Sequence, residues 1–538
     1  MKKRPHLTQM NNSARPIPTA AQKRPCAIPL SLPYHLLLAL LLLLLASGCQ
    51  AQLTPPRAAT QAAQTAAPLP TAQPPLILPA PTPTPGSSGS APAAVAAAAA
   101  LPSLTIWVNE TSAAHLAALN EMIAGFVAVY PATVELRLVD PALLPKLVET
   151  AVISATYNLP DIIIHPAAYT MGWAERGILD VAAAETAVNA IGRSTFDPDA
   201  LALVQLNGQT AALPSDGYLQ LLIYRQDWFT EGNLAPPSTF SAMLTAAAAL
   251  FNRDNLVSGF VVPTESNLIS TQQVFEYLAV ANGCQLIDED GRVLLREPAC
   301  QEALDFYFEI IHNYSPSGVQ TDTSTRNAYL SGRTGLIMSP PHILPQLAGL
   351  DTAVPPTCAE CATNPAYLAQ NSGILTQING ADYGHLTYLG ITNKADRETA
   401  VAFAQFWFND GYETWLRVES ERKVPLRWGT AEATRRFIDA WGTQPIANSS
   451  QSLQDIYGAA LVAQLRSRIA TSDRWGLPQG QGALMTDLYE NLTFSIVLQE
   501  MLSGYFNTTK TLEEAYIRVI DFLPNYPYDQ ESETSDTP

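Results

Sequence analysis

The hydrophobic pattern of the chain opens with one uninterrupted apolar block, Leu36–Ala46. Six basic residues and no acidic residue precede it. A basic segment followed by a short apolar block is typical of a secretory signal, and this block is shorter than the ~20 residues that a membrane-spanning helix needs. The pattern therefore predicts export from the cytoplasm, with translation starting at Met1 or Met10. An uncleaved signal anchor is the alternative.

Apolar residues then follow strand-like and helical periods in turn. The first of these elements are strands at Ser103–Val108, Thr133–Val139 and Ile162–Ile164, with helices ending at Tyr130 and spanning Leu143–Ala155. Thr111 or Ser112 is placed to accept hydrogen bonds from the first turn of the first helix, and Pro131 stops that helix. The order strand–helix–strand–helix–strand with short connections predicts an α/β layered domain with a largely parallel sheet.

The pattern continues with further strands and helices through most of the chain. We expect strands at Gly208–Pro214, Tyr218–Tyr224, Thr334–Met338 and Tyr388–Thr392, and helices at about Thr239–Phe251, Gln272–Asn282, Pro298–His312, Arg326–Ser331 and Arg397–Asn409. The segment Ala431–Leu523 is expected to be mostly helical. The sequence shows no internal repeat and no second membrane segment.

Composition separates two segments from this folded part. Residues 49–102 consist almost wholly of Ala, Pro, Thr, Gln and Ser, with Arg57 as their one charge after Cys49. Such a segment buries too little apolar surface to order itself, so it is predicted to be a disordered tether with a reach of roughly 40 Å as a coil. Residues 524–538 are acidic and poor in apolar side chains, and we expect a disordered tail.

The charge balance limits the partners of the protein. The chain has 30 Lys and Arg against 48 Asp and Glu. Without the basic residues ahead of the apolar block, the net charge is about −24. This charge argues against nucleic acid and against an anionic membrane surface as partners.

Four cysteines lie in the folded part, and their even number suits an oxidising compartment. Cys284 and Cys300 flank a turn and a short strand, so a hairpin brings them together in a predicted disulfide. Cys358 and Cys361 form a C-x-x-C pair that fits a small local disulfide. A zinc site needs four ligands and a redox centre needs a thioredoxin-like context, and both remain alternatives.

Enzyme motifs are absent from the sequence. We find no G-x-S-x-G, no H-E-x-x-H and no phosphate-binding G-x-x-x-x-G-K-[ST], and no two of the seven histidines have metal-ligand spacing. The close carboxylates Asp288 and Asp290 lie in a predicted turn. Glycoside hydrolysis needs only two carboxylates that the fold brings together, so a carbohydrate-active enzyme at the cell surface stays open as an alternative.

Several stretches of the chain, in this order, resemble one family. They are LTIWVNETSAAHLAALNEMIAGFVAVYP, LPDIIIHPAAYTMGWAERGIL, GQTAALPSDGYLQLLIYRQDWFTEGNLAPPSTF, VANGCQLIDEDGRV, EPACQEALDFYFEII and AYLSGRTGLIMSPP. Together they resemble the extracellular solute-binding proteins of ABC importers, in the sugar-binding branch called family 1. The resemblance spans about residues 103–409. The tryptophan that the family carries after its SGP turn is replaced here by His342.

The resemblance implies a two-lobed periplasmic-binding-protein-like α/β fold with hinge strands and a ligand cleft between the lobes. We expect a first lobe of residues 103–221 and 390–435 and a second lobe of residues 222–389 and 436–523. Ligands of α/β sheets bind at the carboxyl ends of strands, and hinged lobes close around them.

The end of the apolar block resembles the lipobox of bacterial lipoproteins. Small residues lead directly to Cys49, which the resemblance implies is lipidated after residues 1–48 are removed as a signal peptide. Leu45 stands one place further from the cysteine than is commonest in that motif. Two or more acyl chains would hold the protein stably on the outer face of the membrane.

Polar and aromatic residues at predicted strand ends are the candidates for ligand binding. Those that follow from strand-end position are Asn109, Glu110, Tyr169, Asp216, Tyr218, Glu265 and Asn267. Those that rest on the resemblance alone are His342, Tyr388 and Arg427.

The sequence therefore predicts a lipid-anchored protein that binds a small solute, expected to be a sugar or oligosaccharide, and passes it to an ABC permease. No catalytic residue, metal or cofactor is expected, and the protein is expected to be a monomer. A surface lipoprotein that binds a polymer or protein partner without transport is the second alternative.

Overall fold

The computed structural model describes residues 101–154, 157–524 and 526. The predictions for the signal peptide, for Cys49, for nearly all of the tether and for most of the acidic tail lie outside these residues. None of the helices in the described ranges is both long and apolar enough to cross a lipid bilayer.

A six-stranded sheet with the order β12-β6-β11-β3-β1-β2 forms the centre of the first lobe. Its strands are β1 (Ser103–Val108), β2 (Thr133–Leu138), β3 (Ile162–Pro166), β6 (Leu213–Leu219), β11 (Gly384–Ile391) and β12 (Val424–Pro425). β1 pairs in parallel with β2 and β3, and β11 pairs antiparallel with β3 and β6. The predicted parallel start of the sheet is confirmed.

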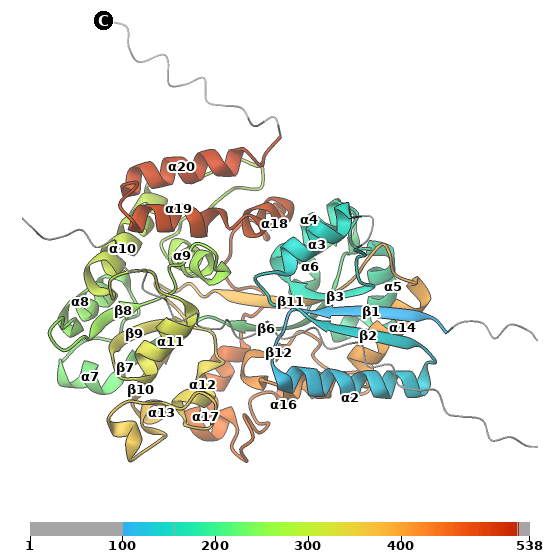
Figure 1. Cartoon of the computed structure of the whole chain (residues 1–538), viewed down its shortest axis with the longest axis horizontal. Helices are drawn as coiled ribbons and strands as arrows, with labels where there is room; N and C mark the ends of the chain where they lie inside the picture. The colour runs from blue at the N-terminus through green and yellow to red at the C-terminus, as the bar shows by residue number, and fades with distance from the viewer. Residues whose placement is uncertain (1–100, 155–156, 525, 527–538) are drawn as a thin grey trace, which may run out of the picture. The chain divides into compact units, whose positions relative to one another are not determined.

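Helices cover both faces of this sheet. They are α2 (Ala113–Val129), α3 (Leu144–Ile153), α4 (Ala167–Glu175), α5 (Val181–Ile191), α6 (Pro198–Ala202), α14 (Arg397–Asn409), α15 (Tyr412–Arg417) and α16 (Arg436–Ala440). In Figure 1 the strands lie between α3 and α4 above and α2 below. Alternate residues of β1 explain this layering, because Ile106 packs into one core cluster and Trp107 into another.

The start of α2 follows the predicted local chemistry. Ser112 is its N-cap and accepts a hydrogen bond from the backbone amide of His115 at 3.2 Å. The helix ends at Val129, and its C-cap Tyr130 directly precedes Pro131. The loop between β1 and α2 is therefore held in place at the carboxyl end of β1, the end of the strands at which α/β sheets bind ligands.

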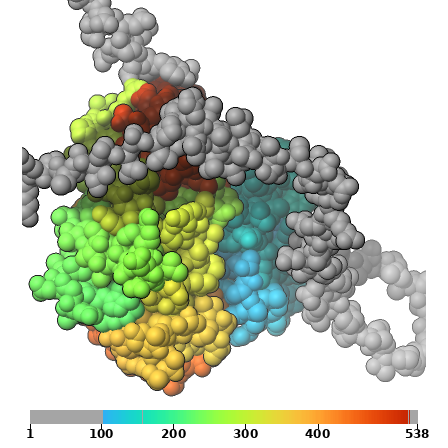
Figure 2. Space-filling view, turned by 60° about the vertical axis from the view of Figure 1, so that its left-hand side comes forward, coloured from blue at the N-terminus to red at the C-terminus, as the bar shows by residue number. Residues whose placement is uncertain are grey.

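A second lobe is built on a four-stranded sheet with the order β10-β7-β9-β8. Its strands are β7 (Leu221–Arg225), β8 (Ser258–Val261), β9 (Thr334–Ser339) and β10 (Ser372–Leu375). Its helices are α7 (Gln226–Glu231), α8 (Phe240–Leu250), α9 (Ile269–Ala281), α10 (Pro298–Tyr314), α11 (Asp322–Leu330), α12 (Ile343–Leu347) and α13 (Tyr367–Asn371). Figure 2 shows the green and yellow surface of this lobe beside the blue surface of the first.

Short elements and a helical C-terminal region complete the described chain. The short elements are β4 (Gln205–Leu206), β5 (Gln209–Thr210), η1 (Arg193–Thr195), η2 (Glu360–Ala362) and η3 (Ser420–Arg422). The last helices are α17 (Leu453–Arg466), α18 (Gly482–Glu490), α19 (Thr493–Leu502) and α20 (Thr508–Ile520), in keeping with the expected helical end.

Two crossings connect the sheets. Gln220 alone separates β6 from β7, so the predicted continuous strand Tyr218–Tyr224 is wrong: its two ends belong to different sheets. The apolar run continues through the crossing, which is why the sequence pattern merged them. The chain returns between β10 and β11, and β11 pairs within the first sheet over its whole length. This pairing favours a return crossing ahead of Gly384 in place of the expected boundary at residues 389 and 390.

Helix α18 lies against α4 of the first lobe and next to α19 (Figure 1). The approach is close at Gly172, where an added Cβ would stand 2.5 Å from Cβ of Thr486. The amide of Gly172 donates to Oγ1 of Thr486 at 3.0 Å, and that hydroxyl donates to the carbonyl of Ala168 at 2.7 Å. The C-terminal helix α18 thus packs directly on the first lobe.

Both predicted disulfides are confirmed. Cys284, just after α9, is bonded to Cys300 near the start of α10, and Cys358 is bonded to Cys361. All four sulfur-bearing side chains are buried.

Removing the longer-range disulfide is expected to cost more stability than removing the local one. The sequence separations are 16 and 3 residues, and loop-closure entropy grows with the length of the closed loop. We expect Cys284→Ala with Cys300→Ala to lower the free energy of unfolding by about 3 kcal/mol, and the other pair by about 2 kcal/mol. Urea unfolding of each double variant measures this. A larger loss from the local pair would contradict the prediction.

Candidate functional site

A cavity of about 370 Å³ lies between the two lobes. Its walls come from the loop after β1, the start of α4 and η3 in the first lobe, from α9 and the turn after β9 in the second, and from β6, β11 and the segment around Arg474. We call it the interlobe cavity. Its volume falls at the lower end of the range for small-molecule sites, which also favour positions between domains.

An ion-pair network forms the wall on the first lobe. Arg422 contacts Oε1 of Glu110 at 2.6 Å and Oε2 of Glu419 at 2.5 Å. Glu110 follows β1, whereas Glu419 and Arg422 precede β12, so the network joins two strand connections that are far apart in sequence. Burial is the largest influence on the pKa of Arg422 and lowers it, but the two carboxylates more than offset this effect and raise the pKa overall.

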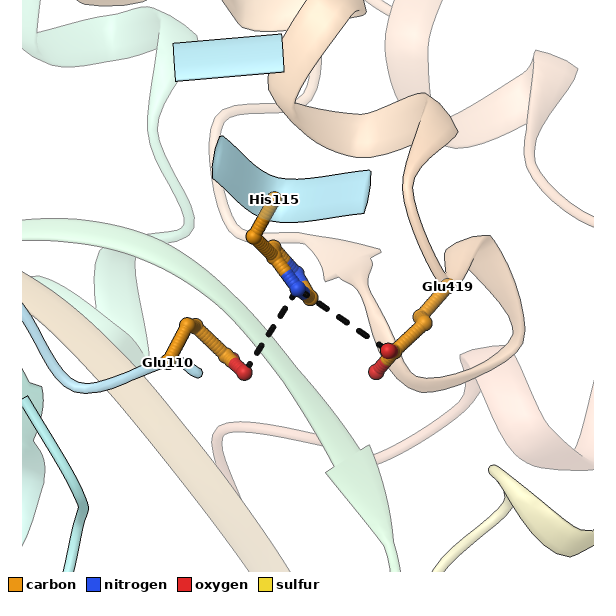
Figure 3. Close-up of side chains that lie close together, drawn as sticks. All are labelled: Glu110, His115 and Glu419. Carbon is orange, nitrogen blue, oxygen red and sulfur yellow. Dashed lines mark ion pairs between the residues drawn. The ribbon is translucent and has the colours of Figure 1, made fainter. Parts of the chain in front are cut away.

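His115 contacts both carboxylates of this network (Figure 3). Its Nδ1 is 3.7 Å from Glu110 and 3.8 Å from Glu419, and its Nε2 is 3.0 Å from Nζ of Lys423. Lys423 has only donors, so Nε2 accepts and Nδ1 carries the proton, 2.7 Å from Oγ of Ser112. Burial first, and then the charge of Lys423, lowers the pKa of His115 to about 3, so the ring is neutral at neutral pH.

The same three side chains have the geometry of a metal-ligand set. Ligand atoms of Glu110, His115 and Glu419 lie within 4.8 Å of one another. Two cations already occupy their surroundings, because Arg422 bonds both carboxylates and Lys423 bonds the imidazole. This arrangement explains the cluster as an internal ion-pair network and gives a metal ion little to gain.

The inner end of the cavity contains a buried carboxyl group. Glu276 of α9 is 2 % exposed and accepts hydrogen bonds from the backbone amide of Trp475 at 2.9 Å and from the hydroxyl of Tyr489 at 2.8 Å. The hydroxyls of Tyr489 and Tyr383 are 3.0 Å apart. Burial raises the pKa of Glu276 to about 7, although both hydrogen bonds oppose this effect.

Aromatic side chains line the part of the cavity next to the crossing strands. Tyr218 stacks on His385 with ring centroids 5.1 Å apart and an angle of 23°. Gln273 of α9 is 3.1 Å from Nδ1 of His385. Burial lowers the pKa of His385 and of His342 to about 4, so both rings are neutral at neutral pH.

Half of the predicted binding residues lie on the cavity wall. They are Asn109, Glu110, Tyr169, Tyr218 and His342. Tyr169 differs from the expectation in one respect: its ring is 1 % exposed and stacks on Trp173 at 5.1 Å, so it offers no open face to a ligand. Its hydroxyl has no partner among the described residues.

Three other predicted residues belong to the core, which corrects the expectation. Asp216 accepts from Nε1 of Trp415 and from the hydroxyl of Ser215, both at 2.7 Å. The hydroxyl of Tyr388 donates to the carbonyl of Ala200 at 2.7 Å, and Arg427 donates to the carbonyl of Phe408 and to Thr195. Each polar group is occupied within the protein, and none of the three lines the cavity.

Glu265 and Asn267 also lie outside the cavity lining. They belong to the loop between β8 and α9, where Asn267 is exposed and the backbone of Glu265 bonds to that of Gln320. Of this part of the chain, only helix α9, which follows the loop, contributes residues to the cavity lining.

The sequence interpretation missed several residues of the lining. They are Gln273, Glu276, His385, Glu419, Arg422, Arg474, Trp475 and Tyr489. Glu276 alone carried a signal, since it is a single carboxylate on the buried side of an otherwise apolar helix segment, VFEYLAVA. A charge at such a position needs a partner or a function.

The sequence profile of the bacterial extracellular solute-binding protein family matches residues 145–416, about half of the chain. The chain belongs to this family. A relative, the ABC transporter periplasmic-binding protein YcjN of Escherichia coli (strain K12), is 23% identical over 282 residues, which cover 51% of this chain and 61% of YcjN. The chain thus matches less than two thirds of that relative's length.

Solved structures confirm the expected two-lobed fold for this family member. An ABC transporter solute-binding protein of Thermotoga lettingae TMO, bound with α-D-tagatose, is 20% identical with a TM-score of 0.59, covering 78% of this chain and 99% of that one. Maltose-bound MalE3 of T. maritima is 16% identical with a TM-score of 0.60, covering 78% and 100%. A sugar transporter of Arthrobacter chlorophenolicus A6 with laminaribiose is 13% identical with a TM-score of 0.62, covering 78% and 99%. At these identities the likeness establishes the fold.

Replacing Glu276 is expected to change how stability depends on pH. The folded protein holds this proton more tightly than the unfolded chain, whose carboxyl has a pKa near 4.5, so ionisation destabilises the fold as pH rises from 4.5 through 7. Glu276→Gln mimics the protonated form. We expect its stability relative to the parent protein to increase by roughly 3 kcal/mol between pH 4.5 and a pH above 7.

Urea unfolding of both proteins across this pH range measures the difference, which cancels the contributions of all other titrating groups. Glu309→Gln, on the exposed side of α10, controls for the substitution itself. A difference for Glu276→Gln that stays constant over the range would contradict the prediction.

Proposed function

We propose that this solute-binding protein captures a small polyhydroxylated solute, a sugar or oligosaccharide, in the interlobe cavity and delivers it to an ABC permease. The observation that carries the proposal is a cavity with walls from both lobes, lined by aromatic rings and by hydrogen-bonding groups. Aromatic faces suit the C–H patches of sugars, and charged or amide groups suit their hydroxyls. Family membership and the sugar-bound structures of the same fold support it.

Binding is proposed to occur without chemistry on the ligand. Each carboxylate of the cavity is engaged by the protein: Glu110 and Glu419 by Arg422, and Glu276 by Tyr489 and the amide of Trp475. A carboxylate held by a guanidinium is a poor proton acceptor, because the positive charge stabilises its ionised form. Incubation with a bound sugar should therefore return the sugar intact.

The protein is proposed to work as a monomer on the outer face of the membrane. The proposal includes a lipid on Cys49 and a tether of residues 49–102 that separates the folded lobes from the bilayer. It rests on the basic and apolar signal pattern and on the Ala- and Pro-rich composition of the segment. Mass spectrometry of the mature N-terminal peptide tests it, and an unmodified Cys49 would contradict it.

Ligand binding is expected to raise thermal stability and to depend on Tyr218. In a thermal-shift screen of mono- and oligosaccharides, a sugar at 100 times its Kd should stabilise the protein by about 2.7 kcal/mol. Tyr218→Ala should weaken that sugar about tenfold, because it removes an aromatic ring from the cavity wall.

Tyr505→Ala is the matched control, since Tyr505 is 76 % exposed and lies outside the cavity. Unchanged affinity in Tyr218→Ala would exclude this ring from the binding site. The absence of a shift with any sugar would overturn the proposed substrate class.

A further inference from the structure

Arg474 differs from Arg422, the other arginine of the interlobe cavity, in its hydrogen-bond partners. Its side chain is buried, with 6 % of its surface exposed, and it lines the cavity. Nε donates to the carbonyl of Ser472 at 3.1 Å, and one terminal nitrogen donates to the carbonyl of Ile469 at 3.0 Å and to the hydroxyl of Ser472. All of these acceptors are neutral, and Arg474 forms no salt bridge with a carboxylate of the described residues.

Arg422 shows the contrast, because it faces the same cavity and contacts two carboxylates. A buried guanidinium loses its hydration, and this loss is offset only by negative charge or by a full set of hydrogen bonds. The hydrogen bonds of Arg474 engage Nε and one terminal nitrogen, and among the described residues the other terminal nitrogen has no acceptor. The guanidinium thus has donors available for a group outside the protein.

Glu276 lines the same cavity and balances the positive charge of Arg474 only in part. Its two oxygens accept from Trp475 and Tyr489, not from the guanidinium. Burial raises its pKa to about 7, so a large part of the population carries no charge at neutral pH. The inner end of the cavity therefore keeps excess positive charge.

Two neutral groups of the wall also lack partners. The hydroxyl of Tyr169 and the side-chain oxygen of Asn109 are buried and make no hydrogen bond with the described residues. Buried polar atoms are rarely left unpaired in folded proteins, since each costs free energy.

We infer that the solute is an acidic sugar, a hexuronate or an oligosaccharide with a uronic acid unit, and that Arg474 binds its carboxylate. The inference deepens the proposed function and rests on it. A singly charged carboxylate fits better than a phosphate, because Glu110 and Glu419 line the same cavity and repel a second negative charge.

Matched ligands test the inference on the unaltered full chain. D-glucuronate and D-glucuronamide have the same shape and differ in charge, and D-glucose lacks the acid altogether; the galacto series and the pair cellobiouronic acid and cellobiose extend the panel. Calorimetric titration is expected to give at least about tenfold tighter binding of the acid than of its amide in the series that fits. D-glucose 6-phosphate is expected to bind more weakly than D-glucuronate.

The outcomes separate the two proposals. Equal affinity for acid and amide, or tighter binding of the neutral sugar or of the phosphate, overturns this inference and leaves the proposed sugar-binding function in place. No binding by any member of the panel overturns both.

Variants locate the charge that selects the acid. Arg474→Gln should reduce the preference for acid over amide about tenfold, because it removes the positive charge that distinguishes the two ligands. Arg474→Lys keeps the charge and should keep most of the preference. Arg417→Gln makes the same charge change at a side chain with 62 % exposure outside the cavity and should have no effect. A preference that survives in Arg474→Gln overturns the assignment to Arg474, and the comparison of acid with amide on the parent chain stands whether or not that variant folds.

Discussion

The passage of the chain between the two sheets at Gln220 is the constraint from which the rest of the structure follows. β6 ends at Leu219 and β7 begins at Leu221, so two consecutive strands belong to different lobes. Gln220 is 8 % exposed, and its backbone amide donates to the backbone carbonyl of Tyr383 at 2.9 Å. Tyr383 belongs to the return crossing, so the two crossings are hydrogen-bonded to each other, and the lobes stay side by side.

This joint also explains where the cavity lies. Gly217 of β6 approaches the carbonyl of His385 so closely that an added Cβ would stand 2.4 Å from that oxygen. β6 and β11 are therefore closely packed here, and Tyr218 of β6 and His385 of β11 line the cavity. A few residues thus serve both as the connection between the lobes and as part of the proposed binding surface, and movement of the lobes would change the cavity directly.

Burial of charge shapes the rest of the cavity. Several of its ionisable side chains are buried, so each ionised group needs a partner or shifts its pKa. Arg422 forms ion pairs with Glu110 and Glu419, and the neutral ring of His115 lies between these carboxylates and Lys423. Glu276 has no salt-bridge partner among the described residues, and burial raises its pKa to about 7, so it keeps its proton at a higher pH than an exposed carboxyl group does. Charge is thus stabilised by ion pairs at one end of the cavity and avoided by protonation at the other. Arg474 has neither a carboxylate partner among the described residues nor a neutral form at neutral pH.

Sequence patterns predicted the parts of this structure that depend on local chemistry. The first strands and helices, the cap at Ser112 and both disulfides follow from periodicity and spacing, and Asn109 and Glu110 follow from their place after a parallel strand. The prediction for Tyr388 was wrong by one residue, since its neighbour Thr387 lines the cavity. Adjacent residues of a strand point to opposite faces, and the pairing of β11 with β6 shifts register between these two residues, which the sequence does not reveal. Arg474, Trp475 and Tyr489 come from a C-terminal segment that reaches the cavity through tertiary packing of α18 on α4, which no local pattern encodes.

The same division between local pattern and tertiary packing applies to function. Solved structures with this fold and 13% to 20% identity hold tagatose, maltose and laminaribiose, so the fold alone does not determine which solute is bound.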